Sequence, residues 1–90
     1  MSIEVRIPTI LRSYTGGAKS VEGKGSTVGE LLADLDSRHP GLSDRIADSA
    51  GLRRFVNVYL NDEDVRFLGG VDTPVNDGDT LTVLPAVAGG

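Results

Sequence analysis

One segment of this 90-residue chain has the pattern of a long helix, and strand patterns lie on both sides of it. Thr27 followed by Glu30 is typical of a capping box, in which two side chains satisfy backbone N–H groups at a helix start. Apolar residues then recur at helical spacing, at Val28, Leu31, Leu32 and Leu35. The helix should end before Pro40. A chain with one long helix among several strands is limited to an α+β arrangement.

The N-terminal region predicts a hairpin. Apolar and polar residues alternate over residues 3–7, which is the pattern of a half-buried strand, and this strand should end at Pro8. The sequence Thr15-Gly16-Gly17 favours a turn before a second strand around residues 19–22. The Ile10-Leu11 segment between the two strands fits more than one structure.

The region after the long helix predicts a short helix and then a buried strand. Leu42 and Ile46 favour a second helical turn, which Ser49-Ala50-Gly51 should break. Residues 55–60 form the most apolar strand pattern, and we expect this strand in the middle of a sheet.

The C-terminal third predicts two further strands. Residues 61–64 read as a polar turn, after which residues 65–67 are expected to pair back as a short edge strand. A second turn signal at residues 77–79 precedes the last strand, at residues 81–84. A hairpin, one helix across a sheet and three more strands predict a ubiquitin-like β-grasp with a mixed sheet of four to five strands.

Composition limits the class of protein. Ninety residues are enough for one domain, which we expect to comprise residues 1–85, followed by a flexible C-terminal tail at residues 86–90. Cysteine is absent, which excludes disulfides, thiolate metal sites and cysteine nucleophiles. The net charge of −4 disfavours nucleic acid as a partner. No apolar run approaches the ~20 residues that span a bilayer, so we expect no membrane partner and a cytoplasmic location.

The C-terminal end carries the best candidate for a reactive group. The chain stops at Gly89-Gly90, after an uncharged stretch of Pro85, Ala86, Val87 and Ala88. Because glycine has no Cβ atom, the active site of another protein could close around this backbone and reach the terminal carboxylate. The last six residues could extend roughly 20 Å at about 3.3 Å each, enough to enter a deep pocket.

Other candidate centres have simpler explanations. His39 has no second ligand at metal spacing, and we expect it to be structural or exposed. The loop at residues 16–20 lacks the glycine that a phosphate-binding loop needs before its lysine. The acidic residues 62–64 are expected to form a solvated turn rather than a docking patch. Phe55 and Tyr59 are expected in the core.

The ending Pro85–Gly90 and the segment Asn76–Leu81 resemble the C-terminal half of the ThiS/MoaD family of ubiquitin-like sulfur carriers. Within this family, residues 7–12, 54–57 and 61–67 are most similar to the actinobacterial CysO-type carriers of cysteine biosynthesis. Small subunits of molybdopterin synthase typically have two prolines before their final Val-Ala-Gly-Gly, whereas this chain has one. This difference favours the cysteine branch.

The resemblance implies a chemistry for the tail. An activating enzyme would use ATP to adenylate the carboxylate of Gly90, and a sulfur donor would then convert it into a thiocarboxylate. Gly89 and Gly90 would carry the sulfur, and residues 85–88 would contact partner enzymes. The acceptor implied is a pyridoxal-phosphate-dependent cysteine synthase, and a metalloprotease would release cysteine from the tail. The carrier itself would bind no cofactor and no metal.

Three functions remain open on the sequence. The favoured one is a sulfur carrier, a protein co-substrate rather than an enzyme, that serves cysteine, thiamine, molybdopterin or secondary-metabolite biosynthesis. The second is a ubiquitin-like modifier, whose Gly90 is joined to lysines of other proteins. The third is a non-catalytic β-grasp adaptor with an inert tail.

Overall fold

The structure is a computed structural model that describes residues 2–48, 51–53 and 56–85. Five strands form one mixed sheet in the order β2-β1-β7-β5-β6. In this order, the strands are β2 (Ser20–Gly23), β1 (Ile3–Arg6), β7 (Thr80–Pro85), β5 (Val56–Leu60) and β6 (Glu63–Asp64). The other elements are the helices α1 (Val28–Arg38) and α2 (Leu42–Ile46), a small hairpin of β3 (Ala47–Asp48) and β4 (Gly51–Leu52), and the 3-10 helices η1 (Thr9–Thr15), η2 (Val65–Phe67) and η3 (Gly70–Asp72).

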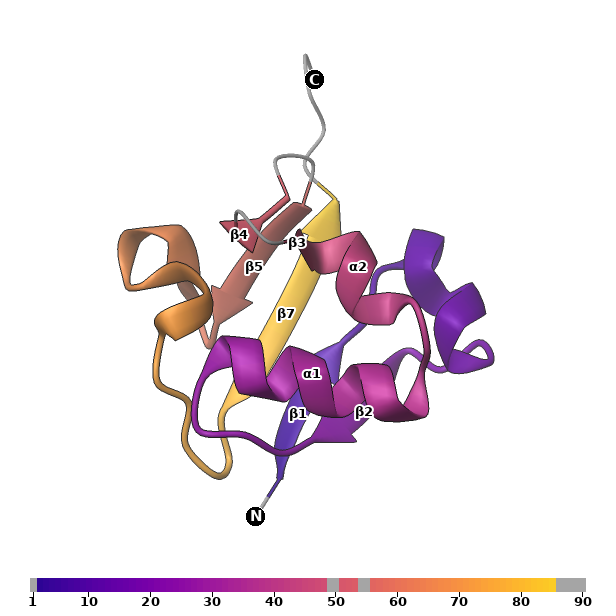
Figure 1. Cartoon of the computed structure of the whole chain (residues 1–90), viewed down its shortest axis with the longest axis horizontal. Coiled ribbons are helices and arrows are strands. Elements are labelled where there is room, and N and C mark those ends of the chain that lie inside the picture. Colours follow the sequence, from indigo (N-terminus) through magenta and orange to yellow (C-terminus); the bar gives the residue numbers. More distant parts are fainter. Residues whose placement is uncertain (1, 49–50, 54–55, 86–90) are drawn as a thin grey trace.

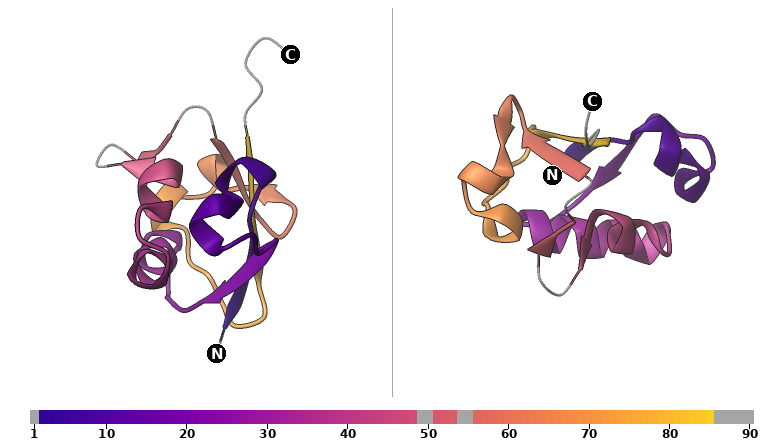
Figure 2. Two further views of the ribbon diagram at one scale, coloured as in Figure 1. Left: turned by 90° about the vertical axis from the view of Figure 1, so that its right-hand side faces the viewer. Right: turned by 90° about the horizontal axis from the view of Figure 1, so that it is seen from above.

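β1 and β7, which come from opposite ends of the chain, are neighbours in the sheet. β1 is antiparallel to β2 and parallel to β7, and β7 is antiparallel to β5. Both α1 and α2 lie on one face of this sheet, and none of the described residues forms a helix over the opposite face (Figures 1 and 2). This arrangement confirms the predicted β-grasp fold and the predicted N-terminal hairpin. The segment between β1 and β2, which the sequence left open, is the 3-10 helix η1.

The core lies between the helices and the sheet. Every residue of the predicted apolar stripe on α1 is buried, and Leu42 and Ile46 of α2 are buried beside it. The sheet contributes alternate residues of each long strand: Ile3, Val5, Val56, Val58, Leu81 and Val83. The two periodicities read from the sequence therefore meet in one core. Among the described residues no helix is long and apolar enough to cross a membrane.

The start of α1 is capped in a slightly different way from the predicted box. The Thr27 hydroxyl accepts a hydrogen bond from the Glu30 backbone N–H at 3.2 Å, as expected. The Glu30 carboxylate, however, accepts from the N–H of Ser26 at 2.9 Å, one residue earlier than a capping box predicts. Two donors at the helix start are still satisfied, so the boundary of α1 follows the sequence signal.

The predicted edge strand at residues 65–67 is wrong. These residues form the 3-10 helix η2, and the edge strand is the two-residue β6 that precedes it. The cause lies in Asp64, whose side-chain oxygen accepts a hydrogen bond from the Arg66 backbone N–H at 2.9 Å. This bond caps η2 and takes the N–H of Arg66 away from a strand ladder.

The interpretation of residues 55–60 holds for the strand and needs a correction for one side chain. β5 lies inside the sheet, between β7 and β6, although β7 is the third of the five strands. Tyr59 is half-buried and not part of the core, because alternation along β5 directs it away from the buried Val56 and Val58. Phe55 lies outside the described residues.

Candidate functional site

The predicted reactive tail begins at the end of the central strand. Pro85 is the last described residue, it is exposed, and its partner in the sheet is Val56 at the start of β5. Leu84 is paired with Asn57 in the same register. We call this end of the sheet, formed by these four residues, the tail exit. The predicted site residues Ala86, Val87, Ala88, Gly89 and Gly90 lie outside the described residues.

β7, the strand that leads to the tail exit, is held by strand pairing on both sides and by the burial of its apolar side chains in the core. β7 pairs with β1 over Thr80–Thr82 and with β5 over Leu81–Pro85. Leu81 and Val83 are 0% and 1% exposed, because both point into the core beneath the helices. A partner that takes up the tail therefore meets a body whose last strand is fixed by backbone pairing and by apolar burial.

The outer face of the sheet at this end carries an exposed apolar residue. Leu84 is 43% exposed there, and Tyr59 and Thr82 lie beside it. Together with Asn61 and Asp62 they line a shallow pocket of about 280 Å³. An apolar residue at the tail exit can be buried by a partner that covers this face, at about 25 cal/mol per Å² of apolar area.

One arginine holds the other edge of the tail exit. The guanidinium of Arg66 donates hydrogen bonds to the side-chain oxygen of Asn57 at 2.8 Å, to the carbonyl of Arg53 at 2.6 Å and to the carbonyl of Val56 at 2.5 Å. Sequence reasoning missed this role. The only signal was that Arg66 and Asn57 each lie in a segment that resembles the sulfur carriers, and the structure brings these two segments together.

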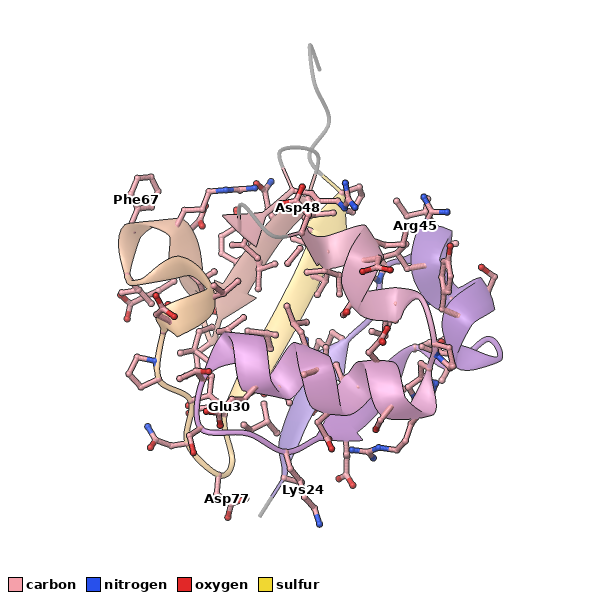
Figure 3. All side chains as sticks on the ribbon, viewed as in Figure 1. Lys24, Glu30, Arg45, Asp48, Phe67 and Asp77 are labelled. Atoms are coloured by element: carbon pink, nitrogen blue, oxygen red, sulfur yellow. The ribbon has the colours of Figure 1, made fainter. Side chains whose placement is uncertain are left out.

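The same end of the molecule carries further arginines and an exposed aromatic ring. Figure 3 shows Arg45, Asp48 and Phe67 at the end of the molecule where β7 finishes, whereas Lys24 and Asp77 lie at the opposite end. Arg53 forms an ion pair with Asp48 at 3.7 Å. Phe67, next to Arg66, is 87% exposed, an unusual state for a phenylalanine.

The structure also describes the less favoured candidates, His39 and the acidic residues 62–64. His39 is half-buried at the end of α1, where its backbone N–H donates to Leu35. Within the described ranges, no group of three metal-ligating side chains is found. In the acidic segment, Asp62 and Glu63 are exposed in a turn and β6, while Asp64 caps η2. The expected solvated turn is therefore limited to residues 61–62, because Glu63 and Asp64 form β6.

Among the described residues, the carboxyl of Asp34 has a shifted pKa, and it lies away from the tail exit. The backbone N–H of Lys24 donates to Asp34 at 2.8 Å and lowers the pKa of its carboxyl. The ion pair with Arg38, one turn along α1, lowers this pKa further. The contact ties the end of β2 to α1, so we assign it to the stability of the body and not to the reaction.

Comparisons with known proteins find similar proteins over the whole length of this chain. The model of the ThiS family matches residues 5–90, which include the terminal glycines. The sulfur carrier protein CysO of Mycobacterium tuberculosis is 54% identical over 100% of both chains. A chain of the solved Amycolatopsis orientalis BexX/CysO complex superposes with a TM-score of 0.92 at 61% identity, covering 98% of this chain and 99% of that one. Small archaeal modifier protein 3 of Haloferax volcanii is 34% identical, again over 100% of both chains.

Proposed function

The chain belongs to the ThiS family and is a sulfur carrier rather than an enzyme, as its sequence predicted, and we propose that it carries sulfur on Gly90 for cysteine biosynthesis. One observation supports this most strongly. The identity of 54% to CysO extends over the full length of both chains. The family match also reaches residue 90, so the likeness includes the terminal glycines and is not restricted to the β-grasp body.

The proposed chemistry follows from the weak reactivity of a carboxylate. The Gly90 carboxylate attacks the α-phosphorus of ATP in the active site of an activating enzyme, which gives an acyl adenylate and pyrophosphate. Hydrosulfide, or a persulfide followed by reduction, then displaces AMP and leaves a thiocarboxylate. This product is a nucleophile, for the same reason that thiolate is the reactive form of cysteine.

The body and the tail have separate tasks in this scheme. β7 ends in a fixed position, and the residues after Pro85 have no bulky or charged side chain that would hinder passage through a narrow channel. The partners we propose are the activating enzyme, a pyridoxal-phosphate-dependent cysteine synthase as sulfur acceptor, and a metalloprotease that releases cysteine. The carrier would hold no cofactor of its own, and ATP would be bound by the activating enzyme.

Intact-mass spectrometry tests the proposal directly. The protein is incubated with a CysO-type activating enzyme, ATP and a sulfide source. We expect the mass to rise by the difference between one sulfur and one oxygen atom, and the change to map to the last peptide. A protein that lacks Gly90 serves as control and should gain nothing. A wild-type protein that stays at its original mass with active enzyme would exclude the thiocarboxylate route.

The cysteine branch is tested by the acceptor. The thiocarboxylate form is mixed with a cysteine synthase of the stated type and its substrate, and in parallel with acceptors of thiamine and molybdopterin synthesis. We expect a tail with cysteine in amide linkage, seen as a defined mass increase, from the first mixture. Faster sulfur loss to either of the other acceptors would assign the carrier to that pathway instead.

A modifier is the second candidate, because a small archaeal modifier protein is 34% identical over the full length. A modifier would form isopeptide bonds between Gly90 and lysines of other proteins. Denaturing blots of cell extract should then show species of higher mass that disappear when Gly90 is deleted. For a carrier we expect the free protein alone. Unchanged growth without cysteine after the same deletion would indicate an adaptor with an inert tail.

A further inference from the structure

One edge of β5 is covered by a side chain instead of a strand. β6 pairs only with Tyr59 and Leu60, so within the described part of the chain the first half of β5 has no neighbouring strand on that side. The backbone N–H of Val56 donates to the carbonyl of Arg53 at 3.3 Å. The carbonyls of Arg53 and Val56 both accept from Arg66. The guanidinium therefore takes the place of the missing strand at this edge.

The geometry is suited to arginine. Three acceptors are bridged by one planar group, two of them backbone carbonyls and the third the side-chain oxygen of Asn57. Such bonds are charge-assisted and stronger than those between neutral groups. A lysine ammonium in this position would be a point donor without the fixed fork, so it could not hold all three acceptors in the same arrangement.

Two of the three residues that accept hydrogen bonds from the Arg66 guanidinium, Val56 and Asn57, belong to the tail exit. Val56 is opposite Pro85, and Asn57 is opposite Leu84. We propose that Arg66 is a positioning residue: it fixes the start of β5, and through it the end of β7, so that the sulfur-carrying tail begins from a rigid base. Only the expected effect on kinetics rests on the proposed function. The hydrogen bonds by which Arg66 fixes the start of β5 are a property of the free protein.

Two roles of Arg66 can be separated by kinetics. If the start of β5 loosens, Leu84 and Pro85 must be ordered again each time the tail enters an active site. The free-energy cost of ordering the backbone of one residue is enough to lower the rate of adenylation roughly tenfold. Docking of the body is unchanged, so kcat falls and KM stays the same. If Arg66 instead binds the partner directly as a surface cation, its loss raises KM and leaves kcat unchanged.

The experiment compares Arg66→Gln, Arg66→Lys and the control Arg38→Gln. Like Arg66, Arg38 is an exposed arginine, but it lies on α1 and its ion pair is with Asp34 of the same helix. Amide hydrogen exchange is measured by NMR on the free proteins, and kcat and KM for adenylation are measured with the activating enzyme. Circular dichroism checks that each variant is folded. If Arg66→Gln is unfolded, Arg66→Lys serves as the test variant.

We expect faster exchange at Asn57 and Leu84 in both Arg66 variants, with no change at Leu81. We expect kcat to fall about tenfold in Arg66→Gln, with little recovery in Arg66→Lys, and no change in Arg38→Gln. Wild-type exchange at Asn57 and Leu84, a rise in KM alone, or full activity of Arg66→Lys would each overturn the proposal. A wild-type protein that is not adenylated would refute the proposed function, and exchange alone would then decide the role of Arg66.

Discussion

Replacing Gly25 with alanine should destabilise the fold, although the backbone at this position permits a side chain. Gly25 lies between β2 and the cap of α1, and it is not among the glycines with positive φ. A new Cβ atom there would lie 2.6 Å from the backbone nitrogen of Leu31 and 2.9 Å from the backbone carbonyl carbon of Glu30. Both contacts are with the backbone of α1, which cannot rotate away as a flexible side chain can.

Two opposing effects set the magnitude. Alanine in place of glycine lowers the entropy of the unfolded chain, which stabilises the protein by about 0.4–1 kcal/mol where the native conformation suits it. Overpacking of this kind costs about 1–3 kcal/mol. The clash is the larger effect, so we expect a net loss of about 1–2 kcal/mol and a Tm lower by roughly 5–15 °C for a domain of this size.

Differential scanning calorimetry measures this loss. The neighbouring Ser26→Ala is the control, because that side chain is exposed and its removal should stay within about 0.5 kcal/mol of the wild type. A Gly25→Ala protein with an unchanged or raised Tm would refute the reasoning. It would mean that α1 can move away from residue 25 at almost no cost in free energy.

Three further predictions concern α1. Thr27→Ala removes the hydroxyl that caps the helix and should cost about 1 kcal/mol in chemical denaturation, whereas Thr27→Ser should cost much less. Leu35→Ala empties a site that is 0% exposed and should cost about 2–5 kcal/mol; a smaller loss would show that the core collapses around the cavity. Asp34→Asn should be destabilising near neutral pH, because the backbone N–H of Lys24 and then Arg38 lower the pKa of this carboxyl. A folded pKa below the unfolded value gives stability above about pH 4 that is lost on acidification, so the two proteins should converge in acid and differ at pH 7. A difference independent of pH would contradict this.

Local signals predicted the two α-helices but not the 3-10 helices. The cap and the apolar stripe of α1 depend on residues within two turns of each other, and so do the buried Leu42 and Ile46 of α2. Interactions of this range can be read from sequence spacing. The glycine doublet was equally visible, and the comparisons extended the family likeness to it.

Features set by distant residues could not be read in this way. The central place of β7 depends on its pairing with β1, a contact between residues at opposite ends of the chain. Along residues 64–67 the alternation of Val65 and Phe67 imitates a strand, but the side chain of Asp64 starts a 3-10 helix instead. The contacts of Arg66 with backbone carbonyls depend on the same unforeseen turn, so this part of the candidate site had no sequence pattern of its own.

The parallel pairing of β1 with β7 has a mechanical consequence. A force applied at Pro85 acts along β7, and the hydrogen bonds to β1 and β5 lie across that direction. The load is therefore shared in shear by both neighbouring strands and is not concentrated on one bond at a time, as it would be in peeling. An enzyme that holds the last residues and then releases them pulls the molecule along β7, so withdrawal from a deep channel should leave the body intact.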